Sequence, residues 1–316
     1  MPLPLPARDS YPKQLIVDIH SYCNARCSIC PYPFLKKKNP MGIMDENLFI
    51  KIIDDFSDLS KKNEFRGDVL FCNMGELFVH PKIAIDRLRY VIQSDLNFSI
   101  QTNAELMTPE VVDSLKGTGF NGPVTISCHG ISADVYKRIM GLNIDKTLRN
   151  IDYLSHNYSK DKVDIQSIPY HWPRGEAKRV RSFFRQKDIT VRMPLPNNRA
   201  GLLPEIAVRN KTSLCGCNPG RPLGEMVICF DGAVVLCCND MGREEIVGNL
   251  KNNTIQGVWN GNEMLQKISQ IYGGAPSPND FICKKCEFGI TQNGFVNRLV
   301  KNIRYETEKF FLAYLW

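Results

Sequence analysis

The chain has 316 residues, of which 43% are apolar and 23% are charged, and its formal net charge is +7. This length accommodates one barrel of roughly 200–250 residues and a smaller appendage. No apolar stretch reaches the roughly 18–20 residues that cross a bilayer, and the N-terminus lacks the basic and apolar segments of a signal peptide, so we expect a cytoplasmic protein with no membrane partner.

Short β-rich segments alternate with helical patterns along the first two thirds of the chain. We predict strands at 14–20, 68–72, 98–102, 124–128, 162–168 and 190–194. Helices are predicted between them, at 45–59, 81–94, 109–115, 132–140, 144–154 and 176–186. Because strands that alternate with helices form parallel βαβ units, the pattern predicts an α/β fold, a partial (β/α)6 TIM-like barrel with its functional residues at the C-terminal ends of the strands.

The pattern changes near residue 202. Two apolar runs, at 226–230 and 233–237, flank Asp231-Gly232, which is a strong signal for a β-hairpin. A helix is predicted at 262–271, and an amphipathic helix at 295–316 either packs on the barrel or lies on a membrane surface or a partner. We therefore divide the chain into a barrel (1–201), a small C-terminal β-hairpin/α domain (202–294) and a C-terminal helix (295–316).

Three of the twelve cysteines, Cys23, Cys27 and Cys30, lie in one short loop after the first predicted strand. Disulfides are rare in the cytosol, so clustered cysteines there usually bind metal or take part in catalysis. Thiolates suit iron–sulfur clusters or zinc. A structural zinc site needs four ligands and would require a distant fourth residue, whereas a cluster held by three cysteines leaves one iron open.

The Cys-x3-Cys-x2-Cys spacing after the first strand resembles the radical S-adenosylmethionine (SAM) superfamily. In that family, SAM chelates the open iron of a 4Fe–4S cluster, and an electron from an external donor such as flavodoxin or ferredoxin leads to a 5′-deoxyadenosyl radical. That radical abstracts a hydrogen atom from the substrate. The cofactor carries out the difficult step and the protein positions it.

Further segments at the strand ends strengthen this resemblance, which covers roughly residues 15–199. Met74-Gly75-Glu76 is similar to the family's Gly-Gly-Glu segment, which implies that Glu76 accepts a hydrogen bond from the methionine ammonium of SAM. The resemblance also implies that Gly75, Asn103, Ser127 and Tyr32 contact SAM, Ser127 at the carboxylate and Tyr32 at the adenine.

Three positions depart from the family pattern: Ile29 replaces an aromatic residue, Met74 replaces a glycine, and His129 stands where many relatives carry Asp. The residues alone leave simpler interpretations open. The three cysteines could form a structural zinc site, Glu76 could form a salt bridge at the barrel rim, and Asn103 and Ser127 could serve in ordinary turns.

Seven further cysteines follow residue 210, among them Cys283 and Cys286 in a Cys-x2-Cys pair. With segments 231–240, 248–250 and 258–260, they resemble the SPASM/twitch extension of radical SAM enzymes, which implies one auxiliary 4Fe–4S cluster. Its ligands would be Cys283, Cys286, one of Cys215 and Cys217, and one of Cys237 and Cys238. We expect Cys217 and Cys238, and a four-cysteine zinc ribbon is the alternative.

The remaining cysteines suggest a second role. A thiol that returns a hydrogen atom to the opposite face of a substrate radical would make the enzyme an epimerase, whereas loss of a second electron to the auxiliary cluster would make it a dehydrogenase. The candidate hydrogen donors are Cys72, Cys128, Cys215 and Cys237.

The substrate is the least determined part of this interpretation. Basic residues gather along the helix at 174–187 and at 36–38, where they form either a solvated face or a site for an anionic small molecule. Rim positions at 171–172 and 197–199 could hold a polyhydroxylated ligand. Oxidation or epimerisation of a sugar or aminocyclitol is our first expectation, a peptide-modifying maturase is the second, and a metal-cluster protein that binds RNA is the third, although no RNA-binding motif supports it.

Overall fold

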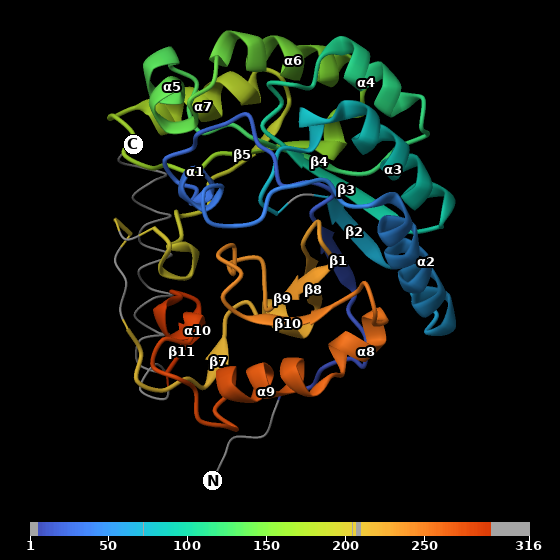
Figure 1. Ribbon diagram of the computed structural model, residues 1–316. Coiled ribbons are helices and arrows are strands. Elements are labelled where there is room, and N and C mark those ends of the chain that lie inside the picture. Colours follow the sequence, from blue (N-terminus) through green and yellow to red (C-terminus); the bar gives the residue numbers. More distant parts are fainter. Residues whose placement is uncertain (1–5, 72, 204, 207–209, 292–316) are drawn as a thin grey trace.

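The computed structural model describes residues 6–71, 73–203, 205–206 and 210–291. One nine-stranded sheet in the order β10-β9-β8-β1-β2-β3-β4-β5-β6 runs through it (Figure 1). Six consecutive strands pair in parallel with their neighbours in chain order: β1 (Gln14–Val17), β2 (Asp68–Phe71), β3 (Asn97–Thr102), β4 (Val124–Ser127), β5 (Val163–Gln166) and β6 (Thr190–Arg192).

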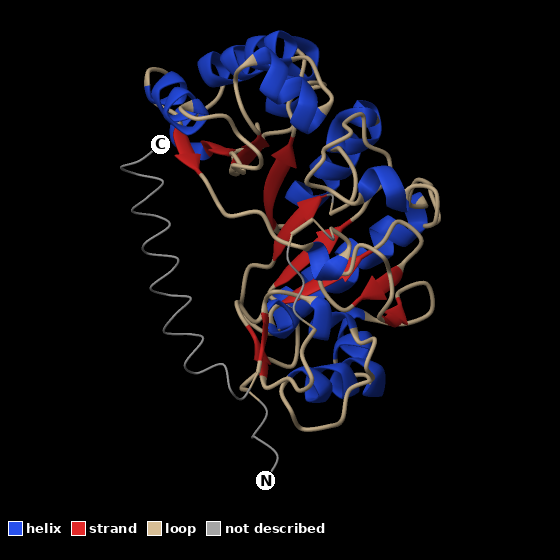
Figure 2. Ribbon diagram, turned by 90° about the vertical axis from the view of Figure 1, so that its left-hand side faces the viewer, coloured by secondary structure: helices blue, strands red, loops and turns tan. Residues whose placement is uncertain are grey.

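Helices connect these strands and cover the outer side of the twisted sheet (Figure 2). They are α1 (Tyr32–Leu35), α2 (Glu46–Lys62), α3 (Pro81–Gln93), α4 (Pro109–Lys116), α5 (Ala133–Met140), α6 (Ile144–Asn157) and α7 (Glu176–Arg185). Local chemistry marks their ends. Asp45 caps α2 by accepting the Leu48 N–H, and Gly141 ends α5 in the left-handed conformation.

Burial alternates along the strands and separates the two faces of the sheet. In β4, Val124 and Ile126 are buried in the main core, whereas Thr125 and Ser127 are half-buried. The half-buried positions of β3 to β5 are polar: Ser99, Gln101, Thr125, Ser127, Asp164 and Gln166. Successive side chains of a strand point to opposite faces, so the main core lies between sheet and helices and a polar inner face remains.

The second half of the chain extends this same sheet. β8 (Glu225–Ile228) pairs in parallel with β1, so that Val17 lies opposite Ile228. β9 (Ala233–Val235) returns from β8 through Asp231-Gly232, where Gly232 has a φ of 82°, and β10 (Ile246–Asn249) pairs with β9. The predicted hairpin is therefore present, but its pairing with β1 had no counterpart in the sequence analysis.

The remaining elements are short. They are α8 (Ile255–Trp259), α9 (Asn262–Ile271), α10 (Ile282–Lys285), the strand pair β7 (Gly216–Cys217) and β11 (Gly289–Ile290), and the 3-10 turns η1 (Leu77–Val79), η2 (Lys160–Lys162), η3 (Arg199–Gly201) and η4 (Arg221–Leu223). The predicted helix at 295–316 lies outside the described residues. In the part of the chain that the structure describes, no helix has the length and apolarity needed to cross a membrane.

The prediction of a partial TIM-like barrel followed by a small hairpin and helix domain is confirmed. The nine strands of the large sheet run in one series from β10 to β6, and β7 and β11 form a separate pair. Most strands end a few residues earlier than predicted: β1 ends at Val17 rather than at residue 20, and β5 ends at Gln166 rather than at 168. The residues beyond these ends form the loops that carry the candidate site.

Candidate functional site

The loop with the first three cysteines lies between β1 and α1, at the C-terminal edge of the sheet. Backbone hydrogen bonds fasten it to the end of α5, from Arg26 N–H to the Met140 carbonyl (3.0 Å) and from Ser28 N–H to the Ile139 carbonyl (2.8 Å). At its start, the Cys23 N–H donates to the Tyr32 hydroxyl over 2.9 Å. Tyr32 is buried, so the structure places it beneath the loop as a support.

The three thiols lie close enough to interact. Burial raises the pKa of Cys27 well above its usual value, and the charges of Cys30 and Cys23 add to this effect. Among the described residues, no three Cys, His, Asp or Glu side chains converge on one point as the ligands of a single metal ion do. Three neighbouring thiolates in one loop are a donor set that fits an iron–sulfur cluster with one open iron.

Glu76 follows β2 and is almost completely buried. Its Oε1 accepts from the Thr102 hydroxyl (2.5 Å) and its Oε2 from the Asn103 N–H (2.7 Å), so the end of β3 orients both carboxylate oxygens. Burial raises the pKa of Glu76 to about 7, and these hydrogen bonds oppose the shift. A buried carboxylate whose donors are neutral groups is suited to receive a cationic group.

Gly75 allows the Glu76 loop to run directly beside the cysteine loop. The Glu76 N–H donates to the Tyr22 carbonyl over 2.8 Å. A Cβ on Gly75 would lie only 2.8 Å from that same carbonyl oxygen and 3.1 Å from the carbonyl oxygen of His20. The close approach of the two backbones therefore requires glycine at this position.

Asn103 links the end of β3 to the cysteine loop, because its Nδ2 donates to Oδ1 of Asn24 over 2.9 Å. Asn24 in turn donates to Glu105 over 2.8 Å. The sequence analysis did not single out Asn24, although its place directly after Cys23 was a signal. Ser127 ends β4 on the half-buried inner face, and no described contact defines a role for its hydroxyl.

His129 joins the segments that follow β4 and β5. Its Nδ1 accepts from the Ile168 N–H over 3.1 Å. Burial lowers its pKa to about 3, and the positive charge of Arg199 adds to this. The imidazole is therefore neutral and serves as a hydrogen-bond acceptor that holds two strand ends together.

In the C-terminal domain, Cys217, Cys237 and Cys286 are near enough to Cys283 for their charges to affect its pKa. Burial raises the pKa of Cys283 well above its usual value, and the next causes are the charges of Cys237, Cys286 and Cys217. The pairing of β7 with β11 sets Cys217 opposite Gly289, three residues after Cys286. Asn239, two residues after Cys237, donates to the Cys286 sulfur at 3.9 Å. Four thiolates fit a four-cysteine cluster.

Cys238 has different surroundings from Cys237. It packs with Ile16 of β1 and with Val227 and Val235 of β8 and β9, and its sulfur accepts a hydrogen bond from the Arg221 guanidinium. Burial raises its pKa, and the charges of Arg221 and Arg199 oppose the shift. We therefore propose Cys237, rather than the expected Cys238, as the fourth ligand.

The candidate hydrogen donors are scattered. Cys128 is fully buried in the core, where its charge affects the pKa of Tyr136 of α5, and its thiol donates to the Gly130 carbonyl, so it does not belong to the half-buried inner face of the sheet. Cys237 belongs to the four-cysteine group, and Cys215 precedes β7, its N–H bonded to the Ile290 carbonyl. Cys72 lies outside the described residues.

Arg199 lies between the two cysteine groups. Its positive charge opposes the rise in pKa that burial causes at Cys30 in one group and at Cys238 beside the other. Its backbone and that of Ala200 are left-handed, with φ of 47° and 54°. The buried Asn198 side chain holds this turn by donating to the Lys285 carbonyl (2.8 Å). Within the described residues Arg199 forms no ion pair with a carboxylate.

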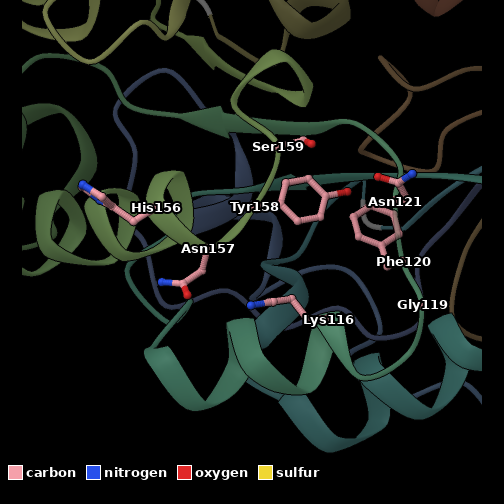
Figure 3. Close-up of a pocket in the computed structure, with 8 residues that line it drawn as sticks. All are labelled: Lys116, Gly119, Phe120, Asn121, His156, Asn157, Tyr158 and Ser159. Atoms are coloured by element: carbon pink, nitrogen blue, oxygen red, sulfur yellow. The ribbon is translucent and has the colours of Figure 1, made fainter.

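Two basic residues in and just after helix α7 form ion pairs. Arg179 pairs with Glu176 and Lys187 with Asp152, both within the helical layer. A surface hollow of about 530 Å³ lies between the end of α4 and the end of α6 (Figure 3). Its walls include Lys116, Phe120 and Tyr158, which precede β4 and β5 in the chain, so it opens at the N-terminal end of these strands. Barrel enzymes place their sites at the opposite end.

Comparison with known proteins agrees with this geometry. Residues 17–171 match the family model of the radical SAM superfamily, and residues 217–287 match that of SPASM, an iron–sulfur cluster-binding domain. The chain is 22% identical over 278 residues to the S-adenosyl-L-methionine-dependent 2-deoxy-scyllo-inosamine dehydrogenase of Niallia circulans, covering 85% of this chain and 90% of that protein. A second match is the tungsten-containing aldehyde ferredoxin oxidoreductase cofactor-modifying protein of Pyrococcus furiosus. The two chains are 34% identical over 107 residues, which are 34% of this chain and 28% of that protein.

Two solved structures share the fold. BtrN in complex with AdoMet and 2-DOIA superimposes with a TM-score of 0.57 at 19% identity, over 87% of this chain and 92% of that chain. Streptococcus suis SuiB bound to the precursor peptide SuiA superimposes with a TM-score of 0.63 at 15% identity, over 89% of this chain and 71% of that chain.

Proposed function

Because the chain belongs to the radical SAM superfamily and carries a C-terminal SPASM domain, we propose that it oxidises a carbinol carbon of a small polyhydroxylated substrate, such as a sugar or an aminocyclitol. The observation that carries this proposal is the meeting of three thiols and the buried Glu76 carboxylate at the C-terminal edge of one parallel sheet. Family membership implies a 4Fe–4S cluster and SAM as cofactors, and the SPASM domain implies auxiliary iron–sulfur chemistry.

We assign the ligands of the first cluster to Cys23, Cys27 and Cys30. When bound, the cluster and SAM supply a 5′-deoxyadenosyl radical that abstracts hydrogen. Glu76, held by Thr102 and Asn103, binds the methionine ammonium of SAM through a charge-assisted hydrogen bond. Gly75 lets this carboxylate approach the cysteine loop, and Asn103 fixes the distance between them through Asn24.

The polar inner face of the sheet supports a hydroxyl-rich substrate. Hydroxyl and amide groups on β3 to β5 can donate to and accept from hydroxyls, in contrast to the apolar inner cluster of Ile16, Leu70 and Val227 on the neighbouring strands. Arg199, which has no carboxylate partner in the described part of the chain, is our candidate for binding an anionic group of the substrate.

Oxidation is preferred to epimerisation. A carbinol becomes a carbonyl when its carbon loses a hydrogen atom, then one electron and one proton, and the auxiliary cysteine group is our candidate destination for that electron. Epimerisation instead needs a thiol that returns a hydrogen atom, and Cys128 is buried in the core. The dehydrogenase of Niallia circulans supports the same choice. A peptide substrate is the alternative, since SuiB was solved with a precursor peptide.

The test is anaerobic reconstitution of the wild type and of a Cys23/Cys27/Cys30→Ala variant, followed by measurement of iron, sulfide, zinc and 5′-deoxyadenosine. We expect about eight irons in the wild type and about four in the variant, as two 4Fe–4S clusters require. Only the wild type should form 5′-deoxyadenosine with dithionite. Bound zinc in place of iron, or no 5′-deoxyadenosine in either protein, would contradict the proposal.

The substrate class is tested in the same assay. Aminocyclitols and amino sugars should accelerate 5′-deoxyadenosine formation and yield a carbonyl product two mass units lighter than the substrate. Acceleration by short peptides alone would instead support the peptide-modifying alternative.

A further inference from the structure

Asp18, the first residue after β1, is almost completely buried and has no role in the proposed function. Its Oδ1 accepts two backbone hydrogen bonds, from the Asn73 N–H (2.6 Å) and from the Met74 N–H (3.1 Å). These two residues directly precede Gly75 and Glu76. A single buried carboxylate oxygen therefore fixes the start of the loop that presents Glu76.

The positive charge that faces Asp18 comes from the C-terminal domain. Burial raises the pKa of Asp18 to about 6, the hydrogen bonds from Asn73 and Met74 and the charge of Arg243 oppose this rise, and the charge of Asp231 adds to it. Arg243 lies six residues after Cys237, in the same loop. It forms an ion pair with Asp231, with 2.7 Å between Nη2 of Arg243 and Oδ2 of Asp231. The backbone of Asp18 also donates to the Ile228 carbonyl of β8, over 2.8 Å.

Met74, where relatives carry glycine, makes a second connection to the same domain. Its side chain is buried against Leu35 and Met241, next to Cys30. Asn39 spans this contact, because its Nδ2 donates to the Met241 carbonyl (2.7 Å) and to the Met74 sulfur (3.8 Å). A side chain at position 74 thus fills space between the first cysteine loop and the C-terminal domain.

We propose that Asp18 and Arg243 are positioning residues for SAM, through which the C-terminal domain holds the loop from Asn73 to Glu76 in its binding conformation. This inference rests on the proposed role of Glu76. It predicts that SAM affinity depends on a charge that lies in the C-terminal domain and never touches the ligand.

The experiment measures the Kd of SAM by anaerobic titration calorimetry in the reconstituted full-length protein. Asp18→Ala should raise the Kd about tenfold, because two backbone donors lose their buried acceptor. Asp18→Asn should restore part of the affinity, since its amide oxygen still accepts both N–H groups. Arg243→Met should raise the Kd by about fivefold with unchanged iron content, because the Asp18 carboxylate loses its compensating charge.

Lys267→Met is the matched control. Lys267 forms a similarly buried ion pair with Glu245 in the same domain (2.6 Å), but makes no described contact with the loop before Glu76. The Kd of SAM for Lys267→Met should equal that of the wild type. The effects of Asp18→Asn and Arg243→Met should also be less than additive in the double variant, since both remove one charge–charge interaction.

Two results would overturn the inference. In the first, Arg243→Met and Asp18→Asn bind SAM with the wild-type Kd and are as stable as the wild type, so neither residue matters. In the second, both variants keep the wild-type Kd but lose thermal stability, which would reveal a purely structural role. If Asp18→Ala does not fold, Arg243→Met decides the question alone. Failure of the proposed function is distinct, because then wild type and Glu76→Gln would bind SAM equally poorly.

Discussion

Asn103 donates its backbone N–H to Oε2 of Glu76 over 2.7 Å and so joins the ends of two neighbouring strands at the candidate cofactor site. The Thr102 hydroxyl donates to the other carboxylate oxygen, Oε1 of Glu76, over 2.5 Å. Together they present a buried carboxylate with fixed direction, beside the loop of three cysteines.

Glu76→Gln should lower SAM affinity at least about tenfold, because the amide has no charge for the ammonium and one of its two ends cannot accept. Calorimetric titration of SAM measures this. Glu110→Gln, on the exposed first turn of α4, is the control and should bind SAM as the wild type does. Equal affinities in all three proteins would remove Glu76 from the cofactor site.

The raised pKa of Glu76, about 7, predicts a pH dependence. Without SAM, the Glu76 carboxyl keeps its proton in the folded protein up to about pH 7, whereas in the unfolded chain it loses this proton near pH 4.5. Between these two pH values the folded state binds more protons than the unfolded state. The contribution of Glu76 to the free energy of unfolding therefore falls as pH rises from 4.5 to about 7. SAM binds the ionised form, so its affinity should rise over about pH 6 to 7.5, below the range where a model α-amino group loses its charge. Glu76→Gln should show no such rise, and a flat wild-type profile would contradict the assignment.

Gly75→Ala should disrupt the approach of the two loops, because the added Cβ would lie 2.8 Å from the Tyr22 carbonyl oxygen. We expect a loss of SAM affinity of about tenfold or more and a destabilisation of about 1–3 kcal/mol. Gly224→Ala is the control, since no atom lies within 4 Å of its added Cβ. Calorimetry and urea denaturation of both variants report the two effects, and wild-type behaviour of Gly75→Ala would show that the loops can separate at no cost.

Cys237 and Cys238 should differ in iron content after reconstitution. Cys237→Ala should lose the auxiliary cluster, about four irons, because the charge of Cys237 acts on Cys283 and that of Cys286 acts on Cys237. Cys238→Ala should keep them, since that sulfur faces Arg221 and the apolar inner cluster. Iron analysis in the Cys23/Cys27/Cys30→Ala background counts the auxiliary cluster alone, and the reverse result would restore Cys238 as the ligand.

Much of the barrel could be predicted from the sequence because its signals are local. These signals act within a few residues: the helical spacing in α2, the prolines at the starts of α3 and α4, and Asp231-Gly232 between β8 and β9. The Cys-x3-Cys-x2-Cys spacing likewise lies in a single loop. Strand ends were predicted too late, because apolar residues continue past the last ladder hydrogen bond, as at Ile19 after β1.

Other features depend on contacts between distant segments. No pattern near β1 indicates that β8, some 200 residues later, would pair with it. Adjacent cysteines such as Cys237 and Cys238 look alike in the sequence, and their different neighbours follow from the direction in which the chain turns after β9. Nor does the sequence show that Cys128, directly after β4, is fully buried in the core with Tyr136 of α5.

The sequence by itself thus determined the βα order, the grouping of three cysteines in one loop and the family, because each of these depends on short-range spacing. Only the tertiary structure decided that Asp18 holds the loop before Glu76, that the charge of Arg243 in the C-terminal domain acts on Asp18, and that the charge of Arg199 acts on cysteines of both domains. The physical reason is that burial and charge pairing arise between segments that are far apart in the chain and come together only when the sheet forms.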